Sequence, residues 1–360
     1  MKRFIIPVYL MSSVVFSHEA LLADAPKIAK LPDASQNLTR IAFGSCADEE
    51  IAQPIWKQIA ADNPELFLFI GDNVYADKNR GEWVNDFSRA ELEYSYRTLQ
   101  QHPEFTDFQS KFPMLVTWDD HDFGKNDAGI EFDLKTDAKE LMLETFGLPQ
   151  DSSIADRDGV YHSAYFGEDG KRIQIIMLDT RWYRSALTVT DERGAKGKER
   201  YLPSQDPDQD MLGDAQWKWL AEELEKPADL RLLVSSIQVL ADGHGWEAWR
   251  TMPKERERLY KLLQDTGASN TVILSGDRHV GGFYQKSDVF KSKLTEITSS
   301  SLNLSFNSGK VDETGPNQLG DLYGPENYGL ILVDWNTGQV SLNLKNNTGQ
   351  VVQNVSISIK

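Results

Sequence analysis

Six short apolar runs, most of them followed by acidic or small polar residues, constrain the fold of this chain more than any other feature. Runs of this kind are typical of buried β-strands. Between them lie helical patterns with apolar residues on one face, at residues 54–61, 214–224 and 253–265. Because strands and helices alternate, the sequence predicts an α/β fold. The six runs span residues 40–43, 66–70, 114–117, 173–178, 232–239 and 271–274.

The last part of the chain follows a different pattern. Residues 328–359 alternate apolar and polar side chains around Asn-Thr-Gly turns at 336–338 and 347–349. This alternation predicts a C-terminal antiparallel meander. Residues 188–210 are polar and highly charged, with Gly and Pro. They predict a long surface loop, and long loops near sites are often functional.

Residues 1–25 are predicted to be an export signal, because two basic residues precede an apolar stretch at 4–16 and small residues follow it. An uncleaved, frayed N-terminus is the alternative. The stretch is too short, and too interrupted by Pro7, to span a bilayer, and no later segment is apolar for long enough. We therefore expect a periplasmic or secreted protein with no membrane span.

The net charge of −17 limits the class of partner. It argues against coating nucleic acid or a membrane surface, because phosphate groups would be repelled. It does not exclude one small phosphoester bound at a cation, since metal bound to clustered acids makes the local potential positive. The single cysteine, Cys46, cannot form an internal disulfide. In an oxidising compartment it is either buried and inert or a metal ligand.

Residues able to bind metal follow the predicted strands. In open α/β sheets, ligands gather at the carboxyl ends of the strands. Burying an ionised carboxylate without a partner is very costly, and metal ions satisfy several carboxylates at once. The residues in these positions are Cys46, Asp72, Asn73, Asp119, Asp120, His121, Asp179, Asp277 and His279.

The individual signals differ in strength. Trp118–Asp122 holds three acids and a histidine directly after a predicted strand, with a solvated turn as the alternative. Asp277 and His279 are two residues apart and can point towards one ion. Cys46 alone is more often a buried apolar residue than a ligand. The combination is far more specific than any one member.

These segments resemble those of the PhoD-like (alkaline phosphatase D) metallophosphatases, and they occur in that family's order from residue 40 to about residue 340. The resemblance implies a four-layer α/β/β/α sandwich of two mixed sheets, with a catalytic domain at residues 38–360. It also implies a ferric ion paired with calcium or another divalent metal. The matching segments are Phe43–Cys46, Gly71–Tyr75, Tyr96–Arg97, Trp118–Asp122 with Asn126–Asp127, Leu178–Arg181, Leu212–Trp217 and Ser275–His279.

Carried over by position, the resemblance assigns a set of metal ligands. Cys46 would be a thiolate ligand to the iron, and Asp72 the bridging carboxylate. The tyrosinate ligand falls on Tyr96, with Tyr94 as its rival. Anionic thiolate and phenolate suit trivalent iron, and carboxylate and amide oxygens suit calcium. An amide ligand to the second metal and two further ligands complete the cluster: Asn126, Asp277 and His279.

The catalytic candidates are His121, Asp120 and Arg181. No protein nucleophile is needed when two ions clamp a phosphate and a hydroxide attacks phosphorus in line. His121 is predicted to protonate the leaving oxygen or to stabilise developing charge. The alternative is a histidine held behind the site by Asp120 or Asp122.

Substrate contacts are predicted for Arg278 and His244. Arg181 and Arg278 either contact phosphate oxygens or pair with the acids of the site. His244 lies on a loop after a strand, and a surface-loop role is its alternative.

Three functions follow from these patterns. The first is an exported phosphoesterase that hydrolyses phosphodiesters, phosphomonoesters or both, as a monomer acting on a small substrate. The second is a metal-dependent hydrolase with a narrower substrate, such as phytate or a nucleotide. The third is a non-catalytic, acidic, cation-binding envelope protein. Asp72, Asp277 and His279 together disfavour the third, because calcium binding alone needs neither histidine nor cysteine.

Overall fold

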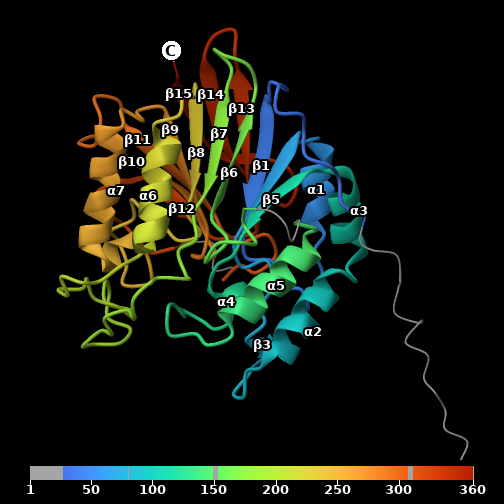
Figure 1. Ribbon diagram of the computed structural model, residues 1–360, viewed down its shortest axis with the longest axis vertical. Helices are drawn as coiled ribbons and strands as arrows, with labels where there is room; N and C mark the ends of the chain where they lie inside the picture. The colour runs from blue at the N-terminus through green and yellow to red at the C-terminus, as the bar shows by residue number, and fades with distance from the viewer. Residues whose placement is uncertain (1–26, 80, 149–152, 307–310, 360) are drawn as a thin grey trace, which may run out of the picture.

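The computed structural model describes residues 27–79, 81–148, 153–306 and 311–359. Two mixed β-sheets pack against each other, and helices cover both outer sides (Figure 1). The predicted four-layer α/β/β/α sandwich is therefore confirmed. The predicted export signal lies outside the described residues. Within the described ranges, no helix combines the length and the apolar character needed to cross a bilayer.

The first sheet joins three parallel strands to the C-terminal meander, in the order β15-β14-β13-β1-β2-β5. β1, β2 and β5 are parallel to one another, and β13 pairs with β1 in the antiparallel direction. β13, β14 and β15 pair antiparallel in sequence order, as the meander prediction requires. The strands are β1 (Arg40–Gly44), β2 (Leu66–Ile70), β5 (Met114–Thr117), β13 (Asn327–Asp334), β14 (Gln339–Asn346) and β15 (Val351–Ser358).

The second sheet has the order β12-β10-β11-β9-β8-β7-β6. β7, β8, β9 and β11 are parallel, whereas β6, β10 and β12 run antiparallel to their neighbours. A separate hairpin pairs β3 (Lys78–Asn79) with β4 (Glu82–Trp83). The strands of the second sheet are β6 (His162–Phe166), β7 (Ile173–Met177), β8 (Leu230–Val234), β9 (Thr271–Ser275), β10 (Gly281–Lys286), β11 (Leu294–Ser299) and β12 (Gln318–Tyr323).

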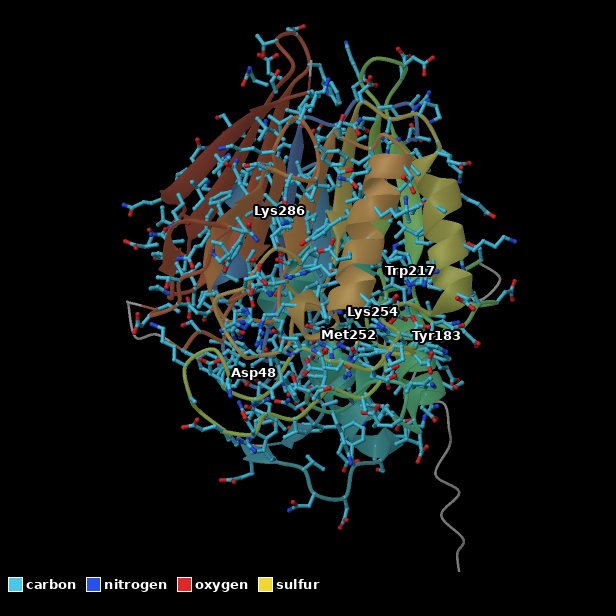
Figure 2. All side chains as sticks on the ribbon, turned by 90° about the vertical axis from the view of Figure 1, so that its left-hand side faces the viewer. Asp48, Tyr183, Trp217, Met252, Lys254 and Lys286 are labelled. Carbon is cyan, nitrogen blue, oxygen red and sulfur yellow. The ribbon has the colours of Figure 1, made fainter. Side chains whose placement is uncertain are left out.

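The central strands are apolar throughout because both of their faces are buried. In β2, Leu68 belongs to the core between the sheets, whereas Phe67 and Phe69 pack edge-on against Trp56 of α1. On the other side, Trp217 of α6 lies next to α7 (Figure 2), and its indole N–H donates to Glu255 Oε2 at 2.8 Å. The helices are α1 (Ile55–Ala61), α2 (Arg89–Leu99), α3 (Pro103–Lys111), α4 (Asp120–Phe123), α5 (Lys135–Thr145), α6 (Gly213–Leu224), α7 (Pro253–Asp265) and the 3-10 helix η2 (Trp249–Thr251).

The structure confirms the three predicted helices within one residue and adds α2, α3 and α5, which the sequence reading did not identify. α2 begins at a capping box formed by Ser88 and Glu91, a sequence signal that could have revealed it. The predicted strand at 232–239 is too long. β8 ends at Val234, and the next residue, Ser235, turns the chain by donating its hydroxyl to the carbonyl of Ile237 at 2.8 Å.

The predicted loop at 188–210 is confirmed. It contains no helix or sheet strand, apart from an isolated bridge between Val189 and Tyr201. This loop borders the carboxyl ends of the strands, and loops in such positions often carry function.

Candidate metal centre

The parallel pairing of the strands brings the predicted site residues together. β1, β2 and β5 are adjacent and parallel, so the segments that follow them leave the same edge of the sheet. The segment after β9 of the second sheet joins them, and an isolated bridge between Ser45 and Ser300 links the two sheets there. Residues from four distant parts of the sequence thus meet at one edge.

The backbone at this edge is strained. Among the described residues, six non-glycine residues have positive φ, and only Asn63 of these lies away from the centre. Left-handed backbone costs a non-glycine residue about 1–3 kcal/mol, and such strain clusters at functional sites. Here it occurs directly after β1, β2 and β9, and at Asp127. The other five residues are Cys46 (φ 60°), Asp72 (φ 47°), Asp127 (φ 56°), Asp277 (φ 67°) and His279 (φ 53°).

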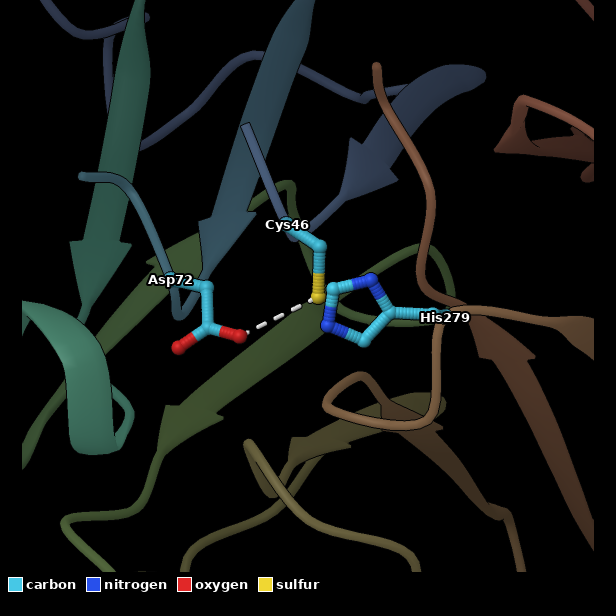
Figure 3. Close-up of side chains that lie close together, drawn as sticks. All are labelled: Cys46, Asp72 and His279. Carbon is cyan, nitrogen blue, oxygen red and sulfur yellow. Dashed lines mark hydrogen bonds between the residues drawn. The ribbon is translucent and has the colours of Figure 1, made fainter. Parts of the chain in front are cut away.

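The first group of potential ligands comprises Cys46, Asp72 and His279, whose donor atoms lie within 4.8 Å of one another (Figure 3). Cys46 Sγ is 3.2 Å from Asp72 Oδ2. His279 Nδ1 lies 2.5 Å from the carbonyl of Leu304, which fixes that nitrogen as the protonated one. The unprotonated Nε2 then faces the group, the arrangement usual for a metal-binding histidine.

Tyr75 completes this first group, although the sequence reading did not assign it a role. Its hydroxyl lies 3.2 Å from Asp72 Oδ2 and 3.3 Å from His279 Nε2. Its position three residues after Asp72, within the Gly71–Tyr75 segment, was the available signal. Burial and the neighbouring charge of Asp72 raise the pKa of the Tyr75 phenol and of the Cys46 thiol well above their usual values. A bound cation would favour the ionised form of both groups.

Three further groups adjoin the first. One comprises Asp72, Asp120 and His121, another Asp119, Asp120 and Asp277, and the third Asp120, Asp127 and Glu247. Asp72 and Asp120 are each shared between groups, so the clusters form one continuous centre. Burial and neighbouring carboxylates raise the pKa of Asp72 and of Asp277 well above its ordinary value.

Unpaired carboxylate oxygens test whether metal fits this centre. Among the described residues, Asp72 Oδ1, Asp119 Oδ2 and Asp120 Oδ1 are buried without a hydrogen-bond partner. A buried carboxylate oxygen without a hydrogen-bond partner costs several kcal/mol unless it binds a cation. The donor set of thiol, phenol, imidazole and carboxylates therefore suits one or more metal ions.

His121 is held by Asp77 rather than by Asp120 or Asp122. Its Nδ1 lies 2.6 Å from Asp77 Oδ1, and its Nε2 is 4.0 Å from Asp120 Oδ2. Burial lowers the pKa of His121, but the carboxylates of Asp120, Asp77 and Asp72 outweigh burial and raise it well above the ordinary value. His121 can therefore carry a proton, with Nε2 directed away from Asp77.

Arg181 lies behind the centre, where its side chain is 0% exposed. Its Nε donates to Asp119 Oδ1 at 2.7 Å, and its Nη1 donates to Glu247 Oε2 at 2.7 Å. The sequence left open whether Arg181 contacts phosphate oxygens or pairs with the acids of the site, and the structure shows the pairing. Arg278 is also paired, with Glu313 at 2.6 Å, but it lines the cavity over the centre.

Two predicted residues do not reach the centre. Tyr96 belongs to the apolar cluster against the first sheet, where its buried hydroxyl has no hydrogen-bond partner among the described residues. Its rival Tyr94 is 37% exposed and donates to Glu50 at 3.2 Å. His244 is buried with both ring nitrogens occupied: Nδ1 accepts the Trp246 amide at 3.1 Å, and Nε2 lies 2.9 Å from Gln238 Oε1.

A cavity of about 410 Å³ opens over the centre. Asp120, His121, Asp277 and His279 form its polar part. Asn126 also lines it, and the backbone N–H of Asn126 donates to Asp77 Oδ2 at 2.8 Å. The space is of a size that holds a small ligand.

Comparisons with known proteins agree with this architecture. A family model described as PhoD-like phosphatase matches residues 41–347. Alkaline phosphatase D of Bacillus subtilis (strain 168) is 25% identical over 305 residues, which cover 73% of this chain and 49% of that protein. The chain thus spans about half the length of this curated relative. A solved structure described as "Structure of PhoD" matches with a TM-score of 0.69 and 18% identity, covering 91% of this chain and 69% of the other, and shows a shared fold.

Proposed function

Because the chain belongs to the PhoD-like phosphatase family, we propose that it is an exported, metal-dependent phosphoesterase that hydrolyses phosphodiesters, phosphomonoesters or both. The observation that carries this proposal is the convergence of unpaired, buried carboxylate oxygens on a thiol, a phenol and an imidazole. Bound cations would satisfy these buried oxygens, which have no hydrogen-bond partner among the described residues. Export rests on the sequence of residues 1–25.

The residues of the first group are proposed to hold a ferric ion. Cys46 and Tyr75 would supply anionic ligands, His279 its Nε2, and Asp72 a carboxylate shared with the second ion. Tyr75 takes the role first assigned to Tyr96, since its hydroxyl contacts two members of the group. The ligands proposed for the second ion, calcium or another divalent metal, are Asp72, Asp120, Asn126 and Asp277.

Bound at these positions, the ions would stabilise charge on the phosphoryl oxygens and lower the pKa of an attacking water. The protein's own groups then act on the substrate. His121, whose proton is retained by the surrounding carboxylates, donates it from Nε2 to the leaving oxygen. Arg278 lines the cavity and orients the phosphate.

Turnover of model esters tests the proposal. The purified chain, supplied with iron and calcium, is expected to hydrolyse bis(p-nitrophenyl) phosphate or p-nitrophenyl phosphate, and chelation is expected to abolish the activity. Metal analysis is expected to find iron in the wild type and much less in Cys46→Ala. Absence of turnover on both esters would refute the proposed phosphoesterase activity. Unchanged iron content in Cys46→Ala would refute the proposal that the Cys46 thiolate binds iron.

Replacement of Asp77 tests the proton donor. Asp77→Asn removes a negative charge that raises the pKa of His121, so that pKa falls. A general acid works only while protonated, so activity is lost as pH rises through its pKa, and the alkaline limb of the pH–rate profile moves to lower pH. We expect kcat/KM at pH 8 to fall about 10- to 100-fold, the usual cost of losing a group that orients a functional histidine.

The matched control is Asp107→Asn, an exposed carboxylate paired with Lys111 on α3. Its pH profile is expected to coincide with that of the wild type. An alkaline limb that stays in place in Asp77→Asn would show that His121 is not the proton donor.

A further inference from the structure

Two large aromatic side chains stand exposed at the mouth of the cavity over the metal centre. Trp83, on the β3–β4 hairpin at the lower end of the molecule in Figure 1, is 59% exposed. Phe306, which lies between β11 and β12, is 71% exposed. Both line the same cavity as Asp120 and Asp277. Apolar surface left in water and bordered by polar groups marks ligand-binding grooves.

Each of these rings rests on a histidine of the centre. Trp83 stacks on His121, with ring centroids 5.8 Å apart and an interplanar angle of 26°. Phe306 lies against His279, at 4.5 Å and 32°. The imidazoles hold one side of each ring in place, and the remaining surface faces solvent. The two rings thus border the cavity over the metal centre and remain largely exposed.

Trp246 also lines the cavity but is already engaged. The guanidinium groups of Arg200 and Arg278 lie 4.9 and 5.5 Å from its ring centroid. Arg200 is in turn paired with Asp127 at 2.7 Å. The Trp246 ring therefore already contacts two arginine side chains. The exposed surfaces of Trp83 and Phe306 remain available to a ligand.

The space extends beyond what a phosphate needs. A second cavity of about 450 Å³ shares Trp83, Asn126, Asp127 and Arg200 with the first. Its far wall comes from the loop at residues 188–210, where Val189 is 73% exposed. A substituent attached to the phosphate can leave the centre past the Trp83 ring.

We propose that Trp83 and Phe306 bind a planar aromatic group of the substrate, so that the preferred substrates are phosphoesters carrying an aryl or nucleobase ring. This inference rests on the proposed phosphoesterase function. A ring gains stacking energy from exposed aromatic side chains. An aliphatic polyol has no π-face to stack and depends on hydrogen bonds, of which these two side chains offer only the indole N–H of Trp83.

Binding of three non-hydrolysable phosphonates tests the inference. Calorimetry on the wild type loaded with iron and calcium gives dissociation constants for phenylphosphonate, cyclohexylphosphonate and methylphosphonate. We expect phenylphosphonate to bind about 10-fold more tightly than methylphosphonate, the effect of one stacked ring. In Trp83→Ala/Phe306→Ala the ratio is expected to fall below about 3. A ratio is used because a general loss of phosphonate affinity cancels from it.

The matched control is Trp219→Ala, which removes a partly exposed indole that packs on Tyr161 and does not line the cavity. Its phenyl-to-methyl ratio is expected to equal that of the wild type. An adenosine 5′-phosphonate run beside phenylphosphonate separates a nucleobase from a simple aryl group as the preferred ring.

Three results would overturn the inference: a wild-type ratio near one, a ratio unchanged in the double variant, or cyclohexylphosphonate binding as tightly as phenylphosphonate. Hydrolysis of methyl p-nitrophenyl phosphate by the wild type is measured in parallel. Hydrolysis without the phenyl preference refutes the aromatic subsite alone. A phenyl preference without hydrolysis of any ester refutes the proposed function and leaves the subsite standing.

Discussion

Asp72→Asn is expected to lower kcat/KM for bis(p-nitrophenyl) phosphate about 1000-fold, because metal-based charge stabilisation is worth several kcal/mol and each ~1.4 kcal/mol is tenfold in rate. Asp72 is shared by two of the four ligand groups, its Oδ2 lies near Cys46 and Tyr75, and its Oδ1 is buried without a hydrogen-bond partner among the described residues. The amide keeps the shape of the side chain but removes the charge that would bridge two ions.

The same variant is expected to leave the metal-free fold as stable as the wild type at pH 8, or more stable. Burial and the carboxylates of Asp120 and Asp119 raise the pKa of Asp72 in the folded state. A carboxyl whose folded pKa is raised favours folding at low pH, and that contribution is lost as pH rises from the unfolded pKa towards the folded one. Asparagine has no charge to lose, so thermal unfolding of the metal-free proteins separates the two effects.

Asp179→Asn is the matched control for Asp72→Asn. Asp179 is also a buried aspartate at a strand end, but its oxygens accept the backbone amides of Val160, Arg181 and Trp182 at 2.8–2.9 Å. This variant is expected to keep kcat/KM within about tenfold of the wild type, since no ligand is lost. Equal losses of activity in both variants would contradict the special role of Asp72.

Arg181→Met is expected to reduce the free energy of unfolding by about 3–5 kcal/mol, since removing one partner of a buried ion pair leaves an uncompensated charge. Asp119 and Glu247 both contact this guanidinium, and all three side chains are at most 1% exposed. Urea denaturation followed by circular dichroism gives the value.

Arg89→Met provides the comparison. Arg89 also meets three carboxylates, those of Glu93, Asp137 and Glu140, but it is 36% exposed. Ion pairs in water contribute about 0–1 kcal/mol, and the loss in Arg89→Met is expected to lie in that range. A loss below about 1 kcal/mol in Arg181→Met would show that the buried network does not stabilise the fold.

The alternation of strands and helices was predicted well, because strands buried on both faces and helices with one apolar face have short-range periodicity. The four layers themselves followed from the family resemblance. The C-terminal meander and the helix at 253–265 followed from local signals of this kind. α2, α3 and α5 were missed, although the capping box at Ser88 and Glu91 was readable. The strand ends also predicted the acids of the centre, since parallel neighbours share an edge.

Individual roles were harder to predict because they depend on contacts between distant residues. Asp77 and His121 are 44 residues apart, and no local pattern reveals that the first orients the second. Tyr75 contacts Asp72 of the centre, whereas Tyr96 on α2 belongs to an apolar cluster. The exposure of Trp83 is likewise set by the tertiary position of a hairpin, which composition does not encode.

The left-handed backbone at Cys46, Asp72, Asp277 and His279 limits how this centre could be transplanted. A designer who copied only the side chains onto ordinary strand ends would obtain the same donors aimed in other directions. The unit that must be carried over is therefore the strained turn after each strand, together with a host stable enough to sustain it.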